Sequence, residues 1–127
     1  MLDPERVRSV VDAYVDTYRR NDKQACIDLF APDAVWHDPV GEPPHVGHEG
    51  IAAFWDQART LAESIVLEPK DVIVCANQAA MVFEIHANLA GGSGMVIEAV
   101  EIFVLDDDAR ISQLSAYWDM SRARPRA

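Results

Sequence analysis

The chain has 127 residues, with 11 Lys and Arg against 21 Asp and Glu, and therefore a formal net charge of −10 at pH 7. Hydrophobic residues make up 50% and charged residues 25%, which is typical of a folded globular chain and excludes a disordered or fibrous one. The negative balance also disfavours nucleic-acid binding, which requires clustered Lys and Arg. We expect one compact domain over residues 1–127.

The sequence contains no apolar run close to the roughly 20 residues that span a bilayer. The first residues, Met1–Arg6, carry acids and a proline, unlike a secretory signal. We therefore expect a cytoplasmic protein without membrane association. Cys26 and Cys75 lie in apolar contexts, which favours two buried free thiols, although a disulfide stays open. The Arg-containing tail, Ser121–Ala127, is expected to be a frayed end.

Helical periodicity is present in the first part of the chain. A helix is predicted over Pro4–Asn21, with Asp3 as N-cap and apolar residues at steps of three and four. A short helix over Lys23–Phe30 and a short strand over Val35–Asp38 follow. The three prolines of Pro39–Pro44 exclude regular structure there.

A third helix is predicted over Glu49–Ser64, and after it the hydrophobic period changes to two. The alternation predicts strands over Asp71–Ala76, Ala79–Leu89, Met95–Leu105 and Ile111–Trp118. Helices followed by an antiparallel meander indicate an α+β fold. We expect a cone, in which a curved antiparallel sheet wraps around three N-terminal helices and encloses an apolar pocket.

One carboxyl group in the predicted strands has unusual neighbours. Because side chains alternate along a strand, Glu101 shares its face with Ala99 and Phe103. Loss of hydration there should raise the pKa of Glu101, which favours a neutral acid that donates a hydrogen bond. The alternative is that Glu101 reaches the strand edge and solvent.

Two further residues are candidates for chemistry. Asp38 ends a predicted strand before Pro39, as a turn-initiating aspartate or as a general base. Tyr14 lies on the apolar face of the first helix, as a core tyrosine or as a catalytic phenol. His45 and His48 lie in a Pro-rich loop without the spacing of a helical metal pair, so we predict no metal site. The glycines of Gly91–Gly94 join two strands and indicate a hairpin turn.

The segment Asp38–Pro44 resembles the matching segment of bacterial steroid Δ5-isomerases, the ketosteroid isomerases. The resemblance extends upstream to Tyr14 and Leu29–Val35, and downstream to Gly47–Phe54 and Ser115–Trp118. It covers essentially the whole chain. The wider fold, shared with nuclear transport factor 2 and polyketide cyclases, is a less specific likeness.

The resemblance implies a role for each of the three candidates. Asp38 matches the general base, Tyr14 the oxyanion-hole phenol, and Glu101 the second oxyanion donor, which the family holds as a protonated aspartic acid. It also implies an apolar site in which Trp118 and Phe83 pack against steroid rings. The expected substrate-binding residues are Trp118, Phe83, Phe54, Trp55, Phe30, Ala116 and Ala99.

The chain departs from the family pattern at two places. Glu101 stands where the family has Asp, and it adds a methylene to a side chain whose placement must be accurate. Phe30 and Trp55 stand where some members have tyrosines that brace the catalytic phenol. Tyr18, one helical turn from Tyr14, is a candidate substitute, although it could equally face solvent.

The activity implied by the resemblance is the cofactor-free isomerisation of 3-oxo-Δ5-steroids to 3-oxo-Δ4-steroids. Asp38 would move a proton from C4 to C6 through a dienolate, whose oxygen Tyr14 and Glu101 would stabilise. The alternatives are a related cone-fold hydrolase or cyclase, or a non-catalytic steroid-binding module. A homodimer is expected from an outward apolar row formed by Val96, Val100, Ile102 and Val104.

Overall fold

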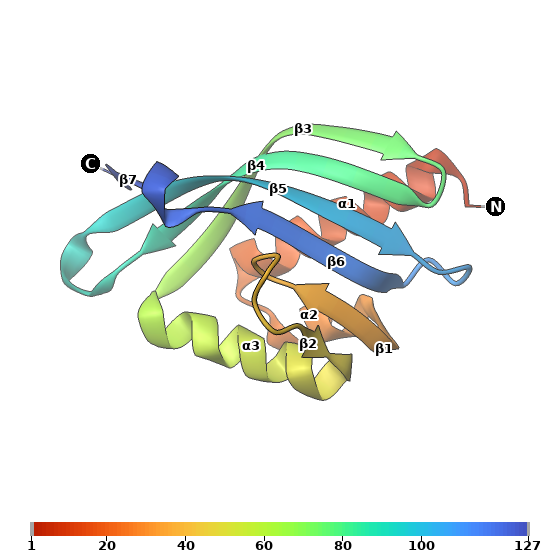
Figure 1. The fold of residues 1–127 in the computed structure, drawn as a ribbon, viewed down its shortest axis with the longest axis horizontal. Helices are drawn as coiled ribbons and strands as arrows, with labels where there is room; N and C mark the ends of the chain where they lie inside the picture. Colours follow the sequence, from red (N-terminus) through yellow and green to blue (C-terminus); the bar gives the residue numbers. More distant parts are fainter. Residues whose placement is uncertain (1, 127) are drawn as a thin grey trace.

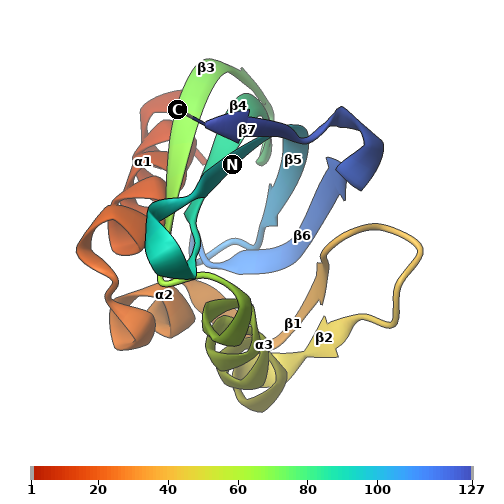
Figure 2. The same cartoon turned by 90° about the vertical axis from the view of Figure 1, so that its left-hand side faces the viewer.

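The computed structural model describes residues 2–126 as three α-helices and a strongly curved sheet (Figures 1 and 2). The helices are α1 (Pro4–Arg20), α2 (Lys23–Asp28) and α3 (Gly47–Leu61). The strands are β1 (Phe30–His37), β2 (His45–Val46), β3 (Ser64–Cys75), β4 (Gln78–Asn88), β5 (Gly94–Leu105), β6 (Ile111–Trp118) and β7 (Arg124–Arg126), with short 3₁₀ turns η1 (Ala90–Gly92) and η2 (Met120–Arg122).

The strands are ordered β2-β1-β6-β5-β4-β3, and β7 pairs with β5. Figure 2 shows the sheet curling around the helices, with α3 near its open side. The α+β cone expected from the sequence is therefore confirmed. One detail was wrong, because β1 and β6 pair in parallel and the sheet is mixed rather than wholly antiparallel. Parallel pairing is possible because a long connection, containing α3 and four strands, separates β1 from β6.

The first helix begins and ends close to the predicted residues. The side chain of Asp3 accepts a hydrogen bond from the backbone N–H of Glu5 at 2.8 Å, which satisfies one of the free donors of the first turn. Asn21 adopts a left-handed conformation with φ of 53° and ends the helix. The apolar face packs into the core through Val7, Val10, Val11, Tyr14 and Tyr18.

Two predicted boundaries shift around the short elements that follow. The second helix ends at Asp28 instead of Phe30, because Phe30 already begins β1. That strand starts five residues earlier than the expected Val35. The register of β1 with β6 is irregular between Phe30 and Val35, a stretch that includes Pro32. Because of this irregularity, the residues before Val35 do not show the alternating pattern by which a strand is recognised in a sequence.

The largest difference from the prediction is at β3, which begins at Ser64 rather than at Asp71. The third helix ends at Leu61, so the chain has seven more residues of strand than the alternation suggested. Pro69 lies within this segment, and the pairing with β4 shifts between Pro69 and Asp71. A bulged edge strand tolerates a proline that a central strand would not.

The C-terminal tail was wrongly expected to be frayed, since Arg124–Arg126 forms β7 and pairs with β5. This pairing brings Arg124 within 2.8 Å of Glu84. Val96, expected on a bare outer row, is buried beside β7. Both cysteines are free thiols, but Cys75 is exposed rather than buried. Among residues 2–126, no helix is long and apolar enough to cross a membrane.

Candidate active site

An apolar cavity of about 630 Å³ opens between the helices and the concave face of the sheet. Its walls come from α1, the loop after β1, α3 and strands β3 to β6. The volume lies within the range of small-molecule sites. Polar groups project into it from α1, from the loop after β1 and from β5.

Tyr14 reaches the cavity from the buried face of α1 and is 1% exposed. Its ring packs edge-on against Phe103, with centroids 5.3 Å apart, and against Trp36 at 6.2 Å. The hydroxyl lies 3.1 Å from that of Tyr18, one turn further along the helix. Burial, followed by the proximity of Glu101, raises the pKa of Tyr14 well above 10. The phenol is therefore a neutral hydrogen-bond donor at physiological pH.

Glu101 projects from the central strand β5 onto the same concave face. It is 1% exposed, and the Tyr14 hydroxyl donates to its Oε2 at 3.3 Å. The second oxygen, Oε1, is buried without a hydrogen-bond partner. Burial raises the pKa of Glu101 well above 4.5, and the charge of Asp38 raises it further. The structure thus excludes the alternative in which Glu101 reaches solvent.

Asp38 follows β1 and is held by contacts to the neighbouring strand. The parallel pairing places His37 opposite Ser115, and the N–H of Val40 donates to the carbonyl of Ala116 at 2.9 Å. The indole Nε1 of Trp118 donates to Asp38 Oδ1 at 2.7 Å. Burial raises the pKa of Asp38 from 3.8 to about 6, although the Trp118 hydrogen bond opposes this rise.

The environments of the two carboxyl groups therefore favour different charges at neutral pH. Burial raises the pKa of Asp38 to about 6, whereas burial and the nearby charge of Asp38 raise the pKa of Glu101 well above 4.5, which favours its protonated form. Opposing pKa environments of this kind separate a general base from a general acid at one pH. The arrangement can accept a proton at Asp38 and donate hydrogen bonds to a developing negative charge from Tyr14 and Glu101.

Four of the expected substrate-binding residues line this cavity: Trp118, Phe83, Phe54 and Ala116. Phe54 stacks on the ring of His45, with centroids 4.1 Å apart and an angle of 22° between the planes. Ala116 pairs with Glu101 across β5 and β6. These residues form a flat apolar wall beside the polar groups.

The other three expected substrate-binding residues do not line the cavity. Phe30 stacks on Trp36 behind Tyr14, with centroids 5.3 Å apart. Trp55 packs against Tyr18 at 5.2 Å, beneath the guanidinium of Arg59. Ala99 borders a separate hollow on the other side of Trp118. Each of the two aromatic residues packs against a tyrosine that itself lines the cavity, Phe30 against Tyr14 and Trp55 against Tyr18.

Sequence reasoning left the position of Tyr18 open, and the structure places its hydroxyl beside that of Tyr14. It also missed most of the apolar wall, which includes Ile65, Ile85, Met95 and Ile97. The alternation of β4 and β5 could have identified the inward members of those strands. His45, Gln57 and Glu42 also line the cavity, and nothing in their spacing indicated this.

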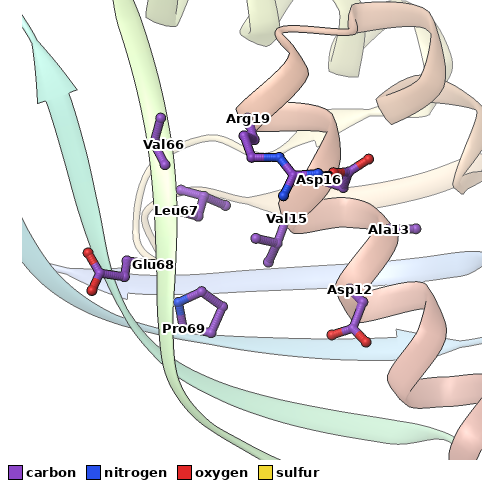
Figure 3. Close-up of a pocket in the computed structure, with 9 residues that line it drawn as sticks. All are labelled: Asp12, Ala13, Val15, Asp16, Arg19, Val66, Leu67, Glu68 and Pro69. Atoms are coloured by element: carbon purple, nitrogen blue, oxygen red, sulfur yellow. Dashed lines mark hydrogen bonds and ion pairs between the residues drawn. The ribbon is translucent and has the colours of Figure 1, made fainter.

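A second hollow lies outside the cone, between α1 and β3 (Figure 3). Its lining includes Val66, Pro69 and the carboxylates of Asp12 and Asp16. Asp16 already pairs with Arg19 and Arg20. This groove has no buried polar group that points into it among the residues described.

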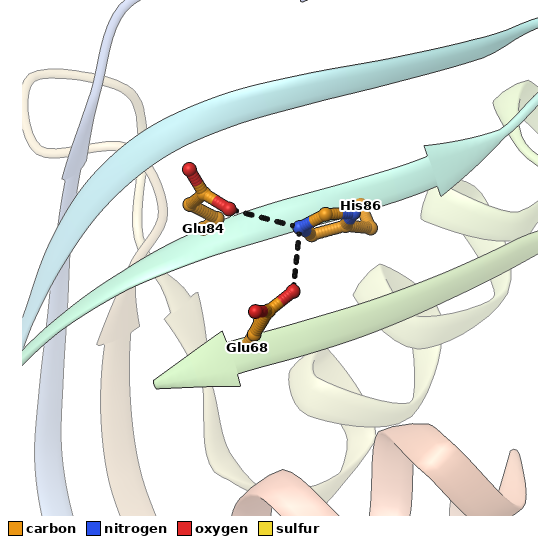
Figure 4. Close-up of side chains that lie close together, drawn as sticks. All are labelled: Glu68, Glu84 and His86. Atoms are coloured by element: carbon orange, nitrogen blue, oxygen red, sulfur yellow. Dashed lines mark hydrogen bonds and ion pairs between the residues drawn. The ribbon is translucent and has the colours of Figure 1, made fainter. Parts of the chain in front are cut away.

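A cluster of Glu68, Glu84 and His86 lies on the outer face of β3 and β4 (Figure 4). The imidazole Nε2 is 3.0 Å from Glu68 and 3.1 Å from Glu84. Lys70 and Arg124 also pair with these carboxylates. Because two cations already neutralise the acids, the cluster fits a surface ion-pair network better than a metal site.

Comparisons with known proteins agree with this architecture. The SnoaL-like domain matches residues 11–114. A steroid Delta-isomerase from Nocardioides simplex is 29% identical over 112 residues, which are 88% of this chain and 89% of that protein.

Two solved structures share the fold at low identity. The epoxide hydrolase/cyclase-like enzyme SalBIII, studied for pyran ring formation in the polyether salinomycin, matches with a TM-score of 0.88 and 21% identity over 97% of this chain and 98% of that chain. A Mycobacterium tuberculosis protein, solved in complex with estradiol-17β-hemisuccinate, matches with a TM-score of 0.85 and 16% identity over 94% of this chain and 98% of that chain.

Proposed function

The chain belongs to the family of SnoaL-like domains, and we propose that it is a cofactor-free steroid Δ-isomerase. It would convert 3-oxo-Δ5-steroids to their conjugated 3-oxo-Δ4 isomers. The observation that carries the proposal is the pair of neutral donors, Tyr14 and Glu101, 3.3 Å apart in the wall of a cavity that Asp38 also lines. The likeness to the Nocardioides simplex isomerase supports the same chemistry.

Asp38 acts as the general base in this scheme. With a pKa of about 6, it is mostly ionised at pH 7, yet it is more basic than an ordinary aspartate. It removes a proton from C4, and the electrons of the C–H bond form a C3–C4 double bond while the carbonyl π electrons move to the C3 oxygen. The resulting dienolate keeps the C5–C6 double bond, which moves to C4–C5 only when C6 is protonated and the C3 carbonyl is restored. The protonated Asp38 then returns the proton to C6, so the enzyme ends in its starting state. Trp118 holds one oxygen of the carboxylate during both steps.

Tyr14 and Glu101 stabilise the charge that develops on the C3 oxygen. Both donors are buried and fixed before the substrate binds, so little reorganisation is needed as the charge forms. The Tyr18 hydroxyl, 3.1 Å from that of Tyr14, can donate to the Tyr14 oxygen and leave the Tyr14 proton free for the ligand. Besides the Tyr14 hydroxyl, the Glu101 carboxyl group can form a hydrogen bond with a ligand oxygen, because its Oε1 atom has no hydrogen-bond partner in the protein.

The proposal is tested by incubating the protein with a 3-oxo-Δ5-steroid and following the ultraviolet absorbance of the conjugated enone. Asp38→Asn should lower turnover by about 100- to 10,000-fold, as expected for loss of a general base. Glu101→Ala should lose about 100- to 1,000-fold, and Glu101→Gln, which keeps a donor, should lose less. Full turnover by Glu101→Ala would disprove the oxyanion hole.

A hydrolase or cyclase would use the same base to activate water or a hydroxyl group. Such chemistry needs polar groups that position the nucleophile near Asp38. The further polar side chains of the cavity are His45 of β2, Gln57 of α3 and Glu42 of the loop between β1 and β2. The walls from β3 to β5 are apolar except at Glu101, and this large apolar surface beside two hydrogen-bond donors favours isomerisation of a steroid. A non-catalytic binding module would instead bind the steroid and leave it unchanged after long incubation.

We also propose that the protein is a homodimer that associates through the outer face of the sheet. Val82 and Tyr117 are 44% and 50% exposed there, next to the half-buried Val100 and Ile102. An apolar face of this kind is typical of a protein interface. Sedimentation at micromolar concentration should give a dimer, and a monomer would rule the association out.

A further inference from the structure

We propose that the mouth of the cavity selects steroids with an uncharged alkyl or acyl substituent at C17, and that Leu61 and Met120 determine this preference. The inference rests on the proposed isomerase function, because it takes the C3 oxygen to lie against Tyr14 and Glu101. It concerns the opposite end of the ligand, which the chemistry of the reaction does not constrain.

The apolar wall is longer than a steroid nucleus. Along β5 the inward residues run from Glu101 through Ile97 to Met95. Six residues of strand from Glu101 to Met95 span about 20 Å at roughly 3.3 Å per residue. The nucleus measures roughly 10 Å from C3 to C17, since eight carbon–carbon bonds of about 1.5 Å zigzag between them. Several ångströms of apolar wall therefore extend beyond the last ring.

Two large apolar side chains lie at this far end. Leu61, the last residue of α3, is 78% exposed, and Met120 in η2 is 55% exposed, yet both line the cavity. The position of Met120 follows from the pairing of β5 with β6, because Ala99 lies opposite Trp118 and Met120 comes two residues later. Leu61 ends α3 three residues before Ser64, which pairs with Asn88, and Asn88 pairs with Gly94 next to Met95. A substituent that leaves ring D toward solvent would cover both side chains.

The charge at the mouth excludes anionic substituents. Among the residues described as lining the cavity there is no Lys or Arg, whereas Glu42 lies exposed in the loop between β1 and β2. A carboxylate on the ligand would lose hydration against the apolar wall without a cation to pair with. It would also be repelled by Glu42 and by the net charge of −10. The occupant is therefore apolar and uncharged.

The test compares three 3-oxo-Δ5-steroids that differ only at C17: the 17β-alcohol, its butyrate ester and its hemisuccinate ester. The two esters have the same length, but only the hemisuccinate carries a terminal carboxylate. Each buried methylene contributes about fourfold in affinity, so KM for the butyrate should be about tenfold below that for the alcohol. KM for the hemisuccinate should be no lower than that for the alcohol.

Substitutions at the mouth of the cavity test whether Leu61 and Met120 cause the preference for the butyrate ester. Leu61→Ser and Met120→Ser should each reduce the butyrate preference to less than about threefold, because polar side chains replace the apolar surface. Ile73→Ser is the matched control, since Ile73 is 60% exposed on β3 and does not line the cavity. It should keep both the basal activity and the preference. Glu42→Gln should lower KM for the hemisuccinate ester only.

Equal KM values for the two esters, or an unchanged preference in both serine variants, would overturn the inference. If the proposed isomerase function is wrong, the result is different, because none of the three steroids would then be isomerised. In that case the binding of the corresponding 3-oxo-Δ4 esters, followed by tryptophan fluorescence, still tests the mouth. Tighter binding of the butyrate than of the hemisuccinate supports it, and equal binding rejects it.

Discussion

The raised pKa of Asp38 predicts that this residue destabilises the folded protein at neutral pH. The pKa rises from 3.8 to about 6, and about 2 pKa units correspond to about 3 kcal/mol at about 1.36 kcal/mol per unit. Because the folded protein holds the proton more tightly, it binds more protons than the unfolded chain between pH 4 and 6. The free energy of unfolding therefore decreases as the pH rises through this window.

Replacing the carboxyl by an amide removes this cost. Asp38→Asn keeps an oxygen that can accept the Trp118 hydrogen bond but has no charge to desolvate. Since Asp38 is partly accessible to solvent, we expect a gain of about 1–3 kcal/mol at pH 7, with the full shift as the upper limit. At pH 4 the gain should fall to about 0.5 kcal/mol, because Asp38 is then protonated in the folded protein and about 40% protonated in the unfolded chain.

The measurement is urea denaturation of wild type and Asp38→Asn at several values between pH 4 and 7. Asp107→Asn, in the exposed turn between β5 and β6, removes the same charge from the surface and should change stability by less than about 0.5 kcal/mol. Parallel pH profiles for wild type and Asp38→Asn would refute the reasoning, because the Asp38 carboxyl would then have the same pKa in both states.

Three further outcomes are expected. The activity measured as kcat/KM should rise with pH through about 6, as Asp38 ionises. Trp118→Phe should move the midpoint of this rise upward by about one pH unit, because the substitution removes a hydrogen bond to the charged form of Asp38. Tyr18→Phe should leave the fold intact but lower turnover about 3- to 10-fold, as judged by circular dichroism and the enone assay, since the Tyr14 phenol loses its hydroxyl neighbour. A thiol reagent should modify Cys75 alone in the native protein, because Cys26 is buried with its pKa raised to about 12, and it should modify both after unfolding.

The parts of the fold that were predictable are those in which a simple period holds. The face of β5 that carries Glu101 followed from strict alternation with Ala99 and Phe103, and all three are buried in the structure. The first half of β3 was missed because Pro69 and the adjacent bulge interrupt the period. The pairing of β7 was missed because Arg and Pro dominate its sequence, and its stability comes from contacts to a distant strand.

The site was predictable to the extent that its residues project from regular elements or match a known motif. The Trp118–Asp38 hydrogen bond joins residues 80 positions apart and depends on the parallel pairing of β1 with β6, which local sequence does not encode. Phe30 and Trp55 were expected in the cavity wall because they match functional positions of relatives. In this chain they pack behind the phenols, since Tyr18 supplies the neighbouring hydroxyl from α1 itself.

The free-energy cost of burying the Glu101 carboxyl group explains why this residue indicates a binding site rather than a structural role. A buried acid with one oxygen unpaired is unfavourable by the desolvation of that group, and a Leu or Met at position 101 would pack against Phe103 and Met81 without this cost. The cost is offset when a ligand oxygen enters the cavity and accepts a hydrogen bond from the protonated Glu101 carboxyl group. The negative charge of the pair then stays on Asp38, where Trp118 holds it, and the neutral acid faces the ligand. A chemistry in which charge develops on a ligand oxygen beside Tyr14 uses both features at once.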